Sequence, residues 1–147
     1  HPGRRGMPAA DVMLDSNVLV YALSDAPSER KKRDTAATLL AEQDFGTSYQ
    51  VLMETWVVAT RKIATPVAEQ KVAAFLDRVL TFPCVPGAAD LYRQAFRLSR
   101  RYEIHPYDAA IVAAAQELGA HTLYSEDLSD GQEYDGVRVV NPFLALH

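Results

Sequence analysis

The sequence predicts an α/β protein of three layers, with a mainly parallel central sheet between two layers of helices. Two observations lead to this prediction: short apolar runs alternate with longer helical patterns, and those patterns carry apolar residues at helical spacing. The length of 147 residues is a third, because it suits one domain that buries about two-thirds of its unfolded surface. Residues 13–147 are therefore expected to form a single domain.

Short apolar runs mark the expected strands. The first run ends in Asp15 and is typical of a buried strand, whereas the run at Cys84 lies between prolines and is a weaker candidate. The expected strands cover residues 12–16, 45–48, 84–85, 121–125 and 137–140.

Capping residues delimit the expected helices between these runs. Pro27 suits a first helical turn, Ser48 suits an N-cap, and Gly119 suits the residue after a helix. Thr65 and Pro66 look like another cap and first position, which would begin a helix at that point. The expected helices cover residues 17–23, 28–43, 49–62, 66–80, 88–101 and 106–118.

The composition excludes several classes of protein. With 15 Lys plus Arg and 19 Asp plus Glu, the formal charge is −4, which argues against gripping nucleic acid by overall charge and leaves room for a local basic patch. Cys84 is the single cysteine, so an intramolecular disulfide and a paired-cysteine zinc site are excluded, and a reducing cytoplasmic location is expected. No stretch approaches the ~18 apolar residues of a membrane span.

The first residues are set apart from the expected domain. Residues 1–6 precede Met7, carry positive charge and have no apolar segment after them, so they do not resemble a signal peptide. We expect residues 1–12 to form a tail.

Four acidic residues lie where a ligand site is expected. Asp15 and Asp127 each follow an expected strand, and ligands of parallel α/β sheets bind beyond the carboxyl ends of the strands. Asp108 lies in the first turn of a helix of small residues, and Glu54 lies on a helix that is apolar nearly all round. Each acid also has an ordinary explanation. A helix cap or helix dipole accounts for Asp15 and Asp108, a polar turn for Asp127, and pairing with Arg61 for Glu54.

The joint placement of these carboxylates predicts a cation site. Two like charges ~4 Å apart cost on the order of 4 kcal/mol at an effective dielectric constant of 20, so a converging cluster needs a cation or shared protons. A ligand set made only of oxygen suits Mg²⁺ or Mn²⁺ rather than zinc, with one or two ions bound. Hydrolysis at phosphate is a common use of such an ion, because it lowers the pKa of a bound water.

Four segments carry a resemblance to a known family. They are LDSNVLVYA at 14–22, SYQVLME at 48–54, YDAAIVAAA at 107–115 and YSEDL at 124–128. In this order, on one α/β domain of this length, they resemble the PIN-domain family, and in particular the VapC-type toxins of prokaryotic toxin–antitoxin pairs. The resemblance runs from residue 13 to residue 143.

The resemblance implies a PIN-like α/β/α domain that acts as a metal-dependent endoribonuclease on RNA phosphodiesters. The catalytic acids, which would hold one or two Mg²⁺ or Mn²⁺ ions, are implied to be Asp15, Glu54, Asp108 and Asp127. Glu126 competes with Asp127 for the fourth position, and Asp130 is a candidate outer ligand through water.

Substrate contacts and partners also follow from the resemblance. The resemblance implies substrate contacts at Ser16, Asn17 and Ser125. The charge pattern adds candidate phosphate contacts at Arg61 and Lys62 and in the basic clusters at 30–33 and 97–101, although solvated helix faces explain each of these clusters equally well. Tyr21, Tyr49 and Tyr107 flank three of the acidic segments and suit either base stacking or core packing. A VapB-type antitoxin and a second copy of the chain are the expected protein partners, and no membrane is expected.

Two other classes of function stay open. A PIN-like domain that keeps the fold could act only by holding RNA or a partner protein, and metal titration would distinguish it from a nuclease. A receiver domain or small phosphatase also uses Mg²⁺ on an α/β fold. A receiver needs a late lysine, however, and the chain has no lysine after Lys71.

Overall fold

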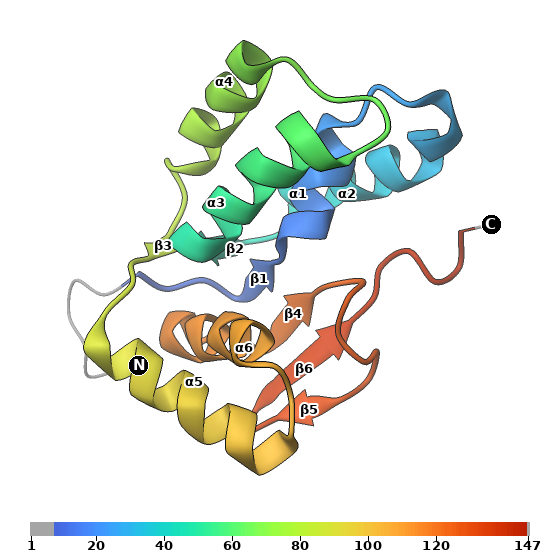
Figure 1. Ribbon diagram of the computed structural model, residues 1–147. Helices are drawn as coiled ribbons and strands as arrows, with labels where there is room; N and C mark the ends of the chain where they lie inside the picture. Colours follow the sequence, from blue (N-terminus) through green and yellow to red (C-terminus); the bar gives the residue numbers. More distant parts are fainter. Residues whose placement is uncertain (1–7, 147) are drawn as a thin grey trace.

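The computed structural model describes residues 8–146, and the greater part of the expected tail lies outside the described residues (Figure 1). Within this range, a six-stranded sheet has the order β3-β2-β1-β4-β6-β5. The strands are β1 (Val12–Leu14), β2 (Phe45–Ser48), β3 (Cys84–Val85), β4 (Thr122–Tyr124), β5 (Glu133–Tyr134) and β6 (Val137–Val140). All neighbouring strands are parallel except β5, which pairs antiparallel with β6. The predicted α/β fold with a mainly parallel sheet is confirmed.

Helices cover both faces of this sheet. They are α1 (Ser16–Leu23), α2 (Arg30–Glu42), α3 (Tyr49–Val57), α4 (Glu69–Val79), α5 (Ala89–Tyr102) and α6 (Pro106–Leu118), with a 3₁₀ turn η1 (Pro27–Glu29) before α2 and a π-helix η2 (Val58–Lys62) after α3. Figure 1 shows α5 and α6 together on one side and α1, α2 and α3 on the other. The arrangement places the sheet in the middle of three layers.

Strand β1 forms the centre of the sheet because its residues are apolar on both faces. Val12, Met13 and Leu14 are all fully buried, as expected for a parallel strand covered by helices on both sides. Parallel pairing with β2 and β4 aligns Val12 with Phe45 and with Thr122. The residues that follow these strands therefore emerge at one common edge.

Helix α6 packs closely on the sheet because it is rich in alanine. Its buried residues are Ala109, Ile111, Val112, Ala113, Ala114, Ala115 and Leu118. At its carboxyl end, Leu118 approaches Gly46 of β2 so closely that a Cβ on Gly46 would lie 2.8 Å from a Leu118 methyl carbon. The helix ends at Gly119, whose φ of 72° gives the expected left-handed cap.

Two expected boundaries are wrong. The helix expected from Pro66 begins at Glu69, because Val67 is buried and its amide donates to the carbonyl of Ala59 at 2.8 Å, which holds the connection extended. The helix expected over 49–62 changes to a π-helix from Val58 onward.

Strand β5 was not expected from the sequence. It has only two residues, and it joins β6 through a turn at Asp135 and Gly136, both with positive φ. An Asp-Gly pair of this kind is a hairpin signal. The two-residue strand is too short to show an alternating pattern.

Residues 10 and 11, which the sequence assigned to the tail, are hydrogen-bonded to the domain just before the first strand. The amide of Ala10 donates to the carbonyl of Leu118 at 3.1 Å, and the carbonyl of Asp11 accepts from the amide of His121 at 3.0 Å. Strand β1 itself begins at Val12. Among residues 8–146, none of the helices has the length and apolar character needed to cross a bilayer.

Candidate functional site at the carboxyl edge of the sheet

The candidate site begins where β1 and β4 end side by side. The parallel register pairs Leu14 with Tyr124, and the amide of Asp15 donates to the carbonyl of Tyr124 at 3.0 Å. The next residue on each strand is therefore polar and faces the same edge. Asp15 and Ser125 meet there, and the Ser125 hydroxyl donates to Asp15 Oδ2 at 2.8 Å.

Asp15 is a buried acid held by neutral donors. It is the N-cap of α1, and its Oδ1 accepts from the amide of Ser16 at 2.7 Å. Its exposed fraction is 3%, and burial raises its pKa to about 6, against the lowering effect of the bonds from Ser125 and Ser16. The negative charges of Glu54 and Asp127 raise that pKa further. Within residues 8–146, no basic side chain forms an ion pair with Asp15.

Glu54 reaches this site from α3. Its Oε2 accepts from the hydroxyl of Ser16 at 3.2 Å, and its Oε1 accepts from Gln50 Nε2 at 3.0 Å. Gln50 is one helical turn before Glu54 and also donates to the carbonyl of Tyr107 at 3.1 Å. In the described structure, Glu54 therefore bonds to Ser16 and Gln50, and not to Arg61, which was the ordinary explanation for an acid on this helix. Sequence reasoning missed Gln50, although its i, i+4 spacing to Glu54 was a usable signal.

Asn17 connects α1 to the loop after β4. Its Nδ2 donates to Asp127 Oδ2 at 3.2 Å, and its Oδ1 accepts from the amide of Glu126 at 3.1 Å. The Ser125 hydroxyl in turn accepts from the amide of Asp127 at 3.2 Å. These contacts fix the Asp127 carboxylate on the same side as Asp15.

Asp108 faces the same site from the first turn of α6. Pro106 starts the helix, and the amide of Tyr107 donates to Nδ1 of the N-cap His105 at 3.1 Å. Partial burial raises the pKa of Asp108, His105 lowers it, and the charges of Asp127 and Glu54 raise it. Glu54 and Asp127 therefore lie close enough to raise the pKa of both Asp15 and Asp108, and we call the region of these four carboxylates the acidic site.

The side chains of the acidic site have the chemistry of a cation site, but their oxygens are not arranged around a single point. Among the described residues, no three Asp, Glu, His or Cys side chains lie close enough together to form a complete metal cluster. Ser16 stands between Asp15 and Glu54, and Ser125 and Asn17 stand between Asp15 and Asp127. Carboxylates separated by hydroxyl and amide groups, around a buried acid of raised pKa, still suit a hard divalent cation that prefers oxygen.

The structure separates Glu126 from Asp127. Glu126 Oε1 accepts from the Tyr21 hydroxyl at 2.7 Å, and Lys32 Nζ lies 3.5 Å from Glu126 Oε2. Lys32 also donates to the Tyr21 hydroxyl at 3.1 Å. Glu126 thus has a cation partner of its own, whereas Asp127 is directed toward Asn17 and the buried acid.

Several of the remaining expected residues lie on the surface. Arg61 and Lys62 are exposed on η2, and Tyr107 is exposed at the start of α6. Asp130 accepts from the amide of Asn141 at 2.8 Å, so its carboxylate serves the loop that follows β6.

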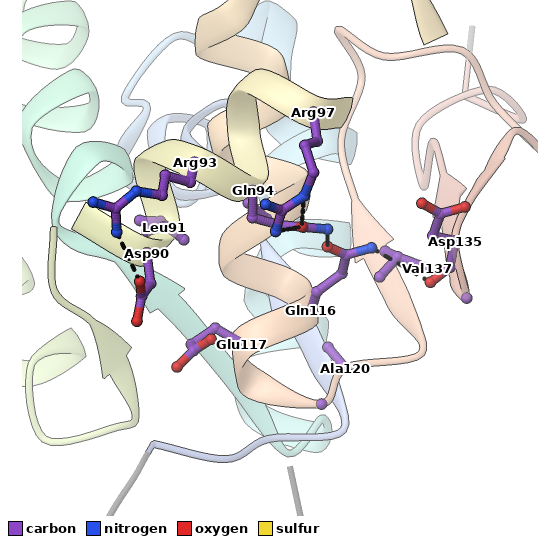
Figure 2. A pocket seen from close by; sticks show the side chains of 13 residues that line it. Asp90, Leu91, Arg93, Gln94, Arg97, Gln116, Glu117, Ala120, Asp135 and Val137 are labelled. Atoms are coloured by element: carbon purple, nitrogen blue, oxygen red, sulfur yellow. Dashed lines mark hydrogen bonds and ion pairs between the residues drawn. The ribbon is translucent and has the colours of Figure 1, made fainter. Parts of the chain in front are cut away.

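A separate cavity lies elsewhere in the described part of the chain. It has a volume of about 600 Å³ and is lined by α5, the carboxyl end of α6 and the β5–β6 turn (Figure 2). Its polar side chains bond to one another: Arg97 donates to Gln94, Gln94 to Gln116, and Gln116 to the carbonyl of Asp135. Asp108 lies at the opposite end of α6, and none of the four acids lines this cavity, so it is separate from the acidic site.

The fold and the site define an α/β protein with a mainly parallel sheet and with acidic side chains beyond the carboxyl ends of its central strands. A family model for the PIN domain matches residues 12–129, and the chain belongs to the PIN domain family.

Solved structures of similar fold come from toxin–antitoxin systems. The VapC20 toxin of Mycobacterium tuberculosis, a toxin that cleaves the sarcin–ricin loop, is 22% identical with a TM-score of 0.63, covering 79% of this chain and 89% of that one. A toxin–antitoxin complex from Klebsiella pneumoniae is 21% identical with a TM-score of 0.67, covering 89% and 97%. VapBC2 of Rickettsia felis, bound to a promoter DNA fragment, is 19% identical with a TM-score of 0.59, covering 87% and 96%. No curated protein sequence matches the chain.

Proposed function

We propose that this protein is an endoribonuclease toxin that depends on Mg²⁺ or Mn²⁺ and is held inactive by a cognate antitoxin. The observation that carries the proposal is that Glu54 and Asp127, near one sheet edge, raise the pKa of both Asp15 and Asp108. Membership in the PIN domain family and a similar fold in the M. tuberculosis toxin that cleaves the sarcin–ricin loop support it.

The four carboxylates divide into two roles in this proposal. Asp15, Asp108 and Asp127 hold one or two divalent ions directly, and Glu54 either joins them or orients the attacking water. The bound ion supplies a water of lowered pKa and a counter-charge for the attacked phosphate. Neutral side chains place the acids: Ser125 orients Asp15, Asn17 orients Asp127, and Gln50 orients Glu54.

In this proposal, exposed basic side chains guide RNA to the acidic site. Arg61 and Lys62 are exposed on η2, directly after the helix that carries Glu54, and they would contact the RNA backbone. An excess of acids in the whole chain makes such local cations the main source of phosphate attraction.

The expected protein partner is a VapB-type antitoxin. Neighbours of similar fold include toxin–antitoxin complexes from K. pneumoniae and R. felis, and both align over most of this chain. A homodimer of this chain is the second proposed assembly, and we propose that the protein acts in the cytoplasm.

Cleavage of RNA by the purified chain tests the proposal. We expect new RNA 5′ ends in the presence of Mg²⁺ or Mn²⁺ and none after EDTA treatment. Isothermal titration with Mn²⁺ gives an independent readout, because a module that only binds RNA need not bind the metal. Cleavage that persists unchanged in EDTA would exclude the metal-dependent mechanism.

A further inference from the structure

A smaller cavity has Asp127, one of the four acids, in its lining. Its volume is about 250 Å³, slightly below the range of about 300–1,000 Å³ typical of sites for drug-sized ligands. Ser16 and Asn17, which donate to Glu54 and Asp127, also line it. A group bound in this cavity would therefore belong to the nucleotide next to the reacting phosphate.

One wall of this cavity is apolar and comes from an irregular part of the backbone. Val58 and Ile63 line it, at the first residue and at the C-cap of the π-helix η2, opposite Val20 of α1. π-helical turns are rare and occur frequently at functional sites, because the wider turn redirects side chains. An apolar wall of this kind suits the flat face of a nucleobase.

The hydrogen-bond donors of the polar wall already bond within the protein, since Tyr21 donates to Glu126, Asn17 to Asp127 and Ser16 to Glu54. The carboxylates of this wall remain as acceptors, and they are held in place. Glu126 is fixed by Tyr21 and Lys32, and it is the charged side chain nearest Asp127 in sequence. Glu29 is fixed by the Ser24 hydroxyl, which donates to its Oε1 at 2.6 Å. An ionised carboxylate accepts hydrogen bonds and donates none, and each of its oxygens accepts more than one. This wall therefore selects a ligand edge that carries N–H donors.

Cations lie just beyond this wall. Arg30, Lys31 and Lys32 line another hollow of about 310 Å³ at the start of α2, together with Pro27, Ser28 and Leu146. The residues of η1 link the two cavities, since Glu29 lines one and Ser28 the other. A phosphate in the outer hollow would complement these charges while its base entered the inner one.

We propose that the cavity between α1, η2 and Glu126 binds a nucleobase of the RNA, and that it selects guanine. Guanine is the base that presents two adjacent N–H donors, at N1 and N2, to a single carboxylate. Glu126 is the reading residue, Glu29 is a second acceptor, and Val58 and Ile63 contact the face of the base. The inference rests on the proposed RNA-directed function and gives that function its sequence preference.

Binding of short RNAs tests this inference without relying on cleavage. The experiment uses the Asp108→Asn variant. Fluorescence anisotropy compares its affinity for the fluorescein-labelled tetranucleotides UUGU, UUIU, UUAU and UUUU (I denotes inosine). We expect UUGU to bind at least fivefold tighter than UUIU, which lacks the N2 donor, and more than tenfold tighter than UUUU. Loss of one bond to a charged acceptor accounts for a difference of this size.

Two kinds of variant separate base reading from general charge. Glu126→Gln should reduce the preference for guanine over hypoxanthine to less than twofold, whereas Glu42→Gln, at an exposed acid of α2, should preserve it. Ile63→Trp fills the cavity without changing charge and should weaken UUGU binding more than tenfold. Ala64→Trp, at the exposed neighbouring position, is its control. Circular dichroism checks that each variant is folded.

The outcomes distinguish this inference from the proposed function. Equal binding of the four RNAs, or a guanine preference that survives both Glu126→Gln and Ile63→Trp, would overturn the base pocket. Selective binding of UUGU by a chain whose wild type cleaves no RNA would support the pocket and reject the nuclease. Metal-dependent cleavage by a chain that binds the four RNAs equally would support the nuclease and reject the base pocket.

Discussion

The Ser125 hydroxyl donates a 2.8 Å hydrogen bond to Asp15 Oδ2 across 110 residues of sequence. The bond joins the ends of two neighbouring parallel strands, and it lowers the pKa of an acid that burial raises. Ser125 thereby favours the ionised form of Asp15, which is the form that binds a cation. The same hydroxyl accepts from the amide of Asp127, so one serine positions two of the four acids.

Neutralising the acids should abolish cleavage while the fold is retained. We expect Asp15→Asn and Asp108→Asn each to reduce RNA cleavage more than 100-fold, because each removes a charge that would hold the ion. Asp77→Asn, at an exposed acid of α4, should leave the rate within twofold. Initial rates of RNA cleavage and circular dichroism are the measurements. Near-normal cleavage by folded Asp15→Asn would reject its role as a ligand.

Removal of Ser125 should impair both stability and activity. Ser125→Ala takes away the bond to Asp15, and we expect a loss of about 1–3 kcal/mol in the free energy of unfolding. The pKa of Asp15 should rise further, so the activity profile should shift to higher pH. Ser129→Ala, at an exposed position of the same loop, serves as the control in urea unfolding and in pH–rate measurements. An unshifted profile would mean that Ser125 has no influence on the acid.

The buried carboxyl of Asp15 should make the metal-free protein less stable as the pH rises. Its pKa is raised from 3.8 to about 6, so the folded state binds the proton more tightly than the unfolded state does. The stabilisation is fully present below pH 3.8 and is lost as the pH rises through about 6. A pKa difference of this size corresponds to at most about 3 kcal/mol in the free energy of unfolding.

Asp15→Asn isolates this contribution from those of other acids. In EDTA, the free energy of unfolding of Asp15→Asn minus that of the wild type should increase between pH 4 and pH 7. Urea unfolding at several pH values measures the difference, and added Mn²⁺ should stabilise only the wild type at pH 7. A difference that does not change with pH would show that the Asp15 pKa is close to its ordinary value.

A packing prediction concerns Gly46, where β2 and α6 meet. A Cβ at this position would lie 2.8 Å from a Leu118 methyl carbon and 3.0 Å from the carbonyl oxygen of Pro83. Gly46→Ala should therefore cost about 1–3 kcal/mol through overpacking. Gly87→Ala is the matched control, because nothing lies within 4 Å of its added carbon. Urea unfolding measures both, and equal stability of the two variants would contradict the close approach.

The fold was predictable from the sequence to a large extent. Alternating apolar strands and helices are a local signal, and residues such as Ser48 and Gly119 cap helices through their own backbone or side-chain chemistry. The late start of α4 was not predictable, because it depends on the bond from the Val67 amide to Ala59, which forms only after packing. Two-residue β5 gave no periodic signal.

The sequence by itself determined which acids and hydroxyls stand at strand ends and helix starts, because the pattern of apolar residues indicates where strands and helices lie along the chain. Tertiary structure alone decided which of them share contacts. Glu126 and Asp127 are adjacent in sequence, but one is held by Tyr21 and Lys32 and the other by Asn17. Side-chain direction and burial separate such neighbours, and both depend on elements that are far apart along the chain.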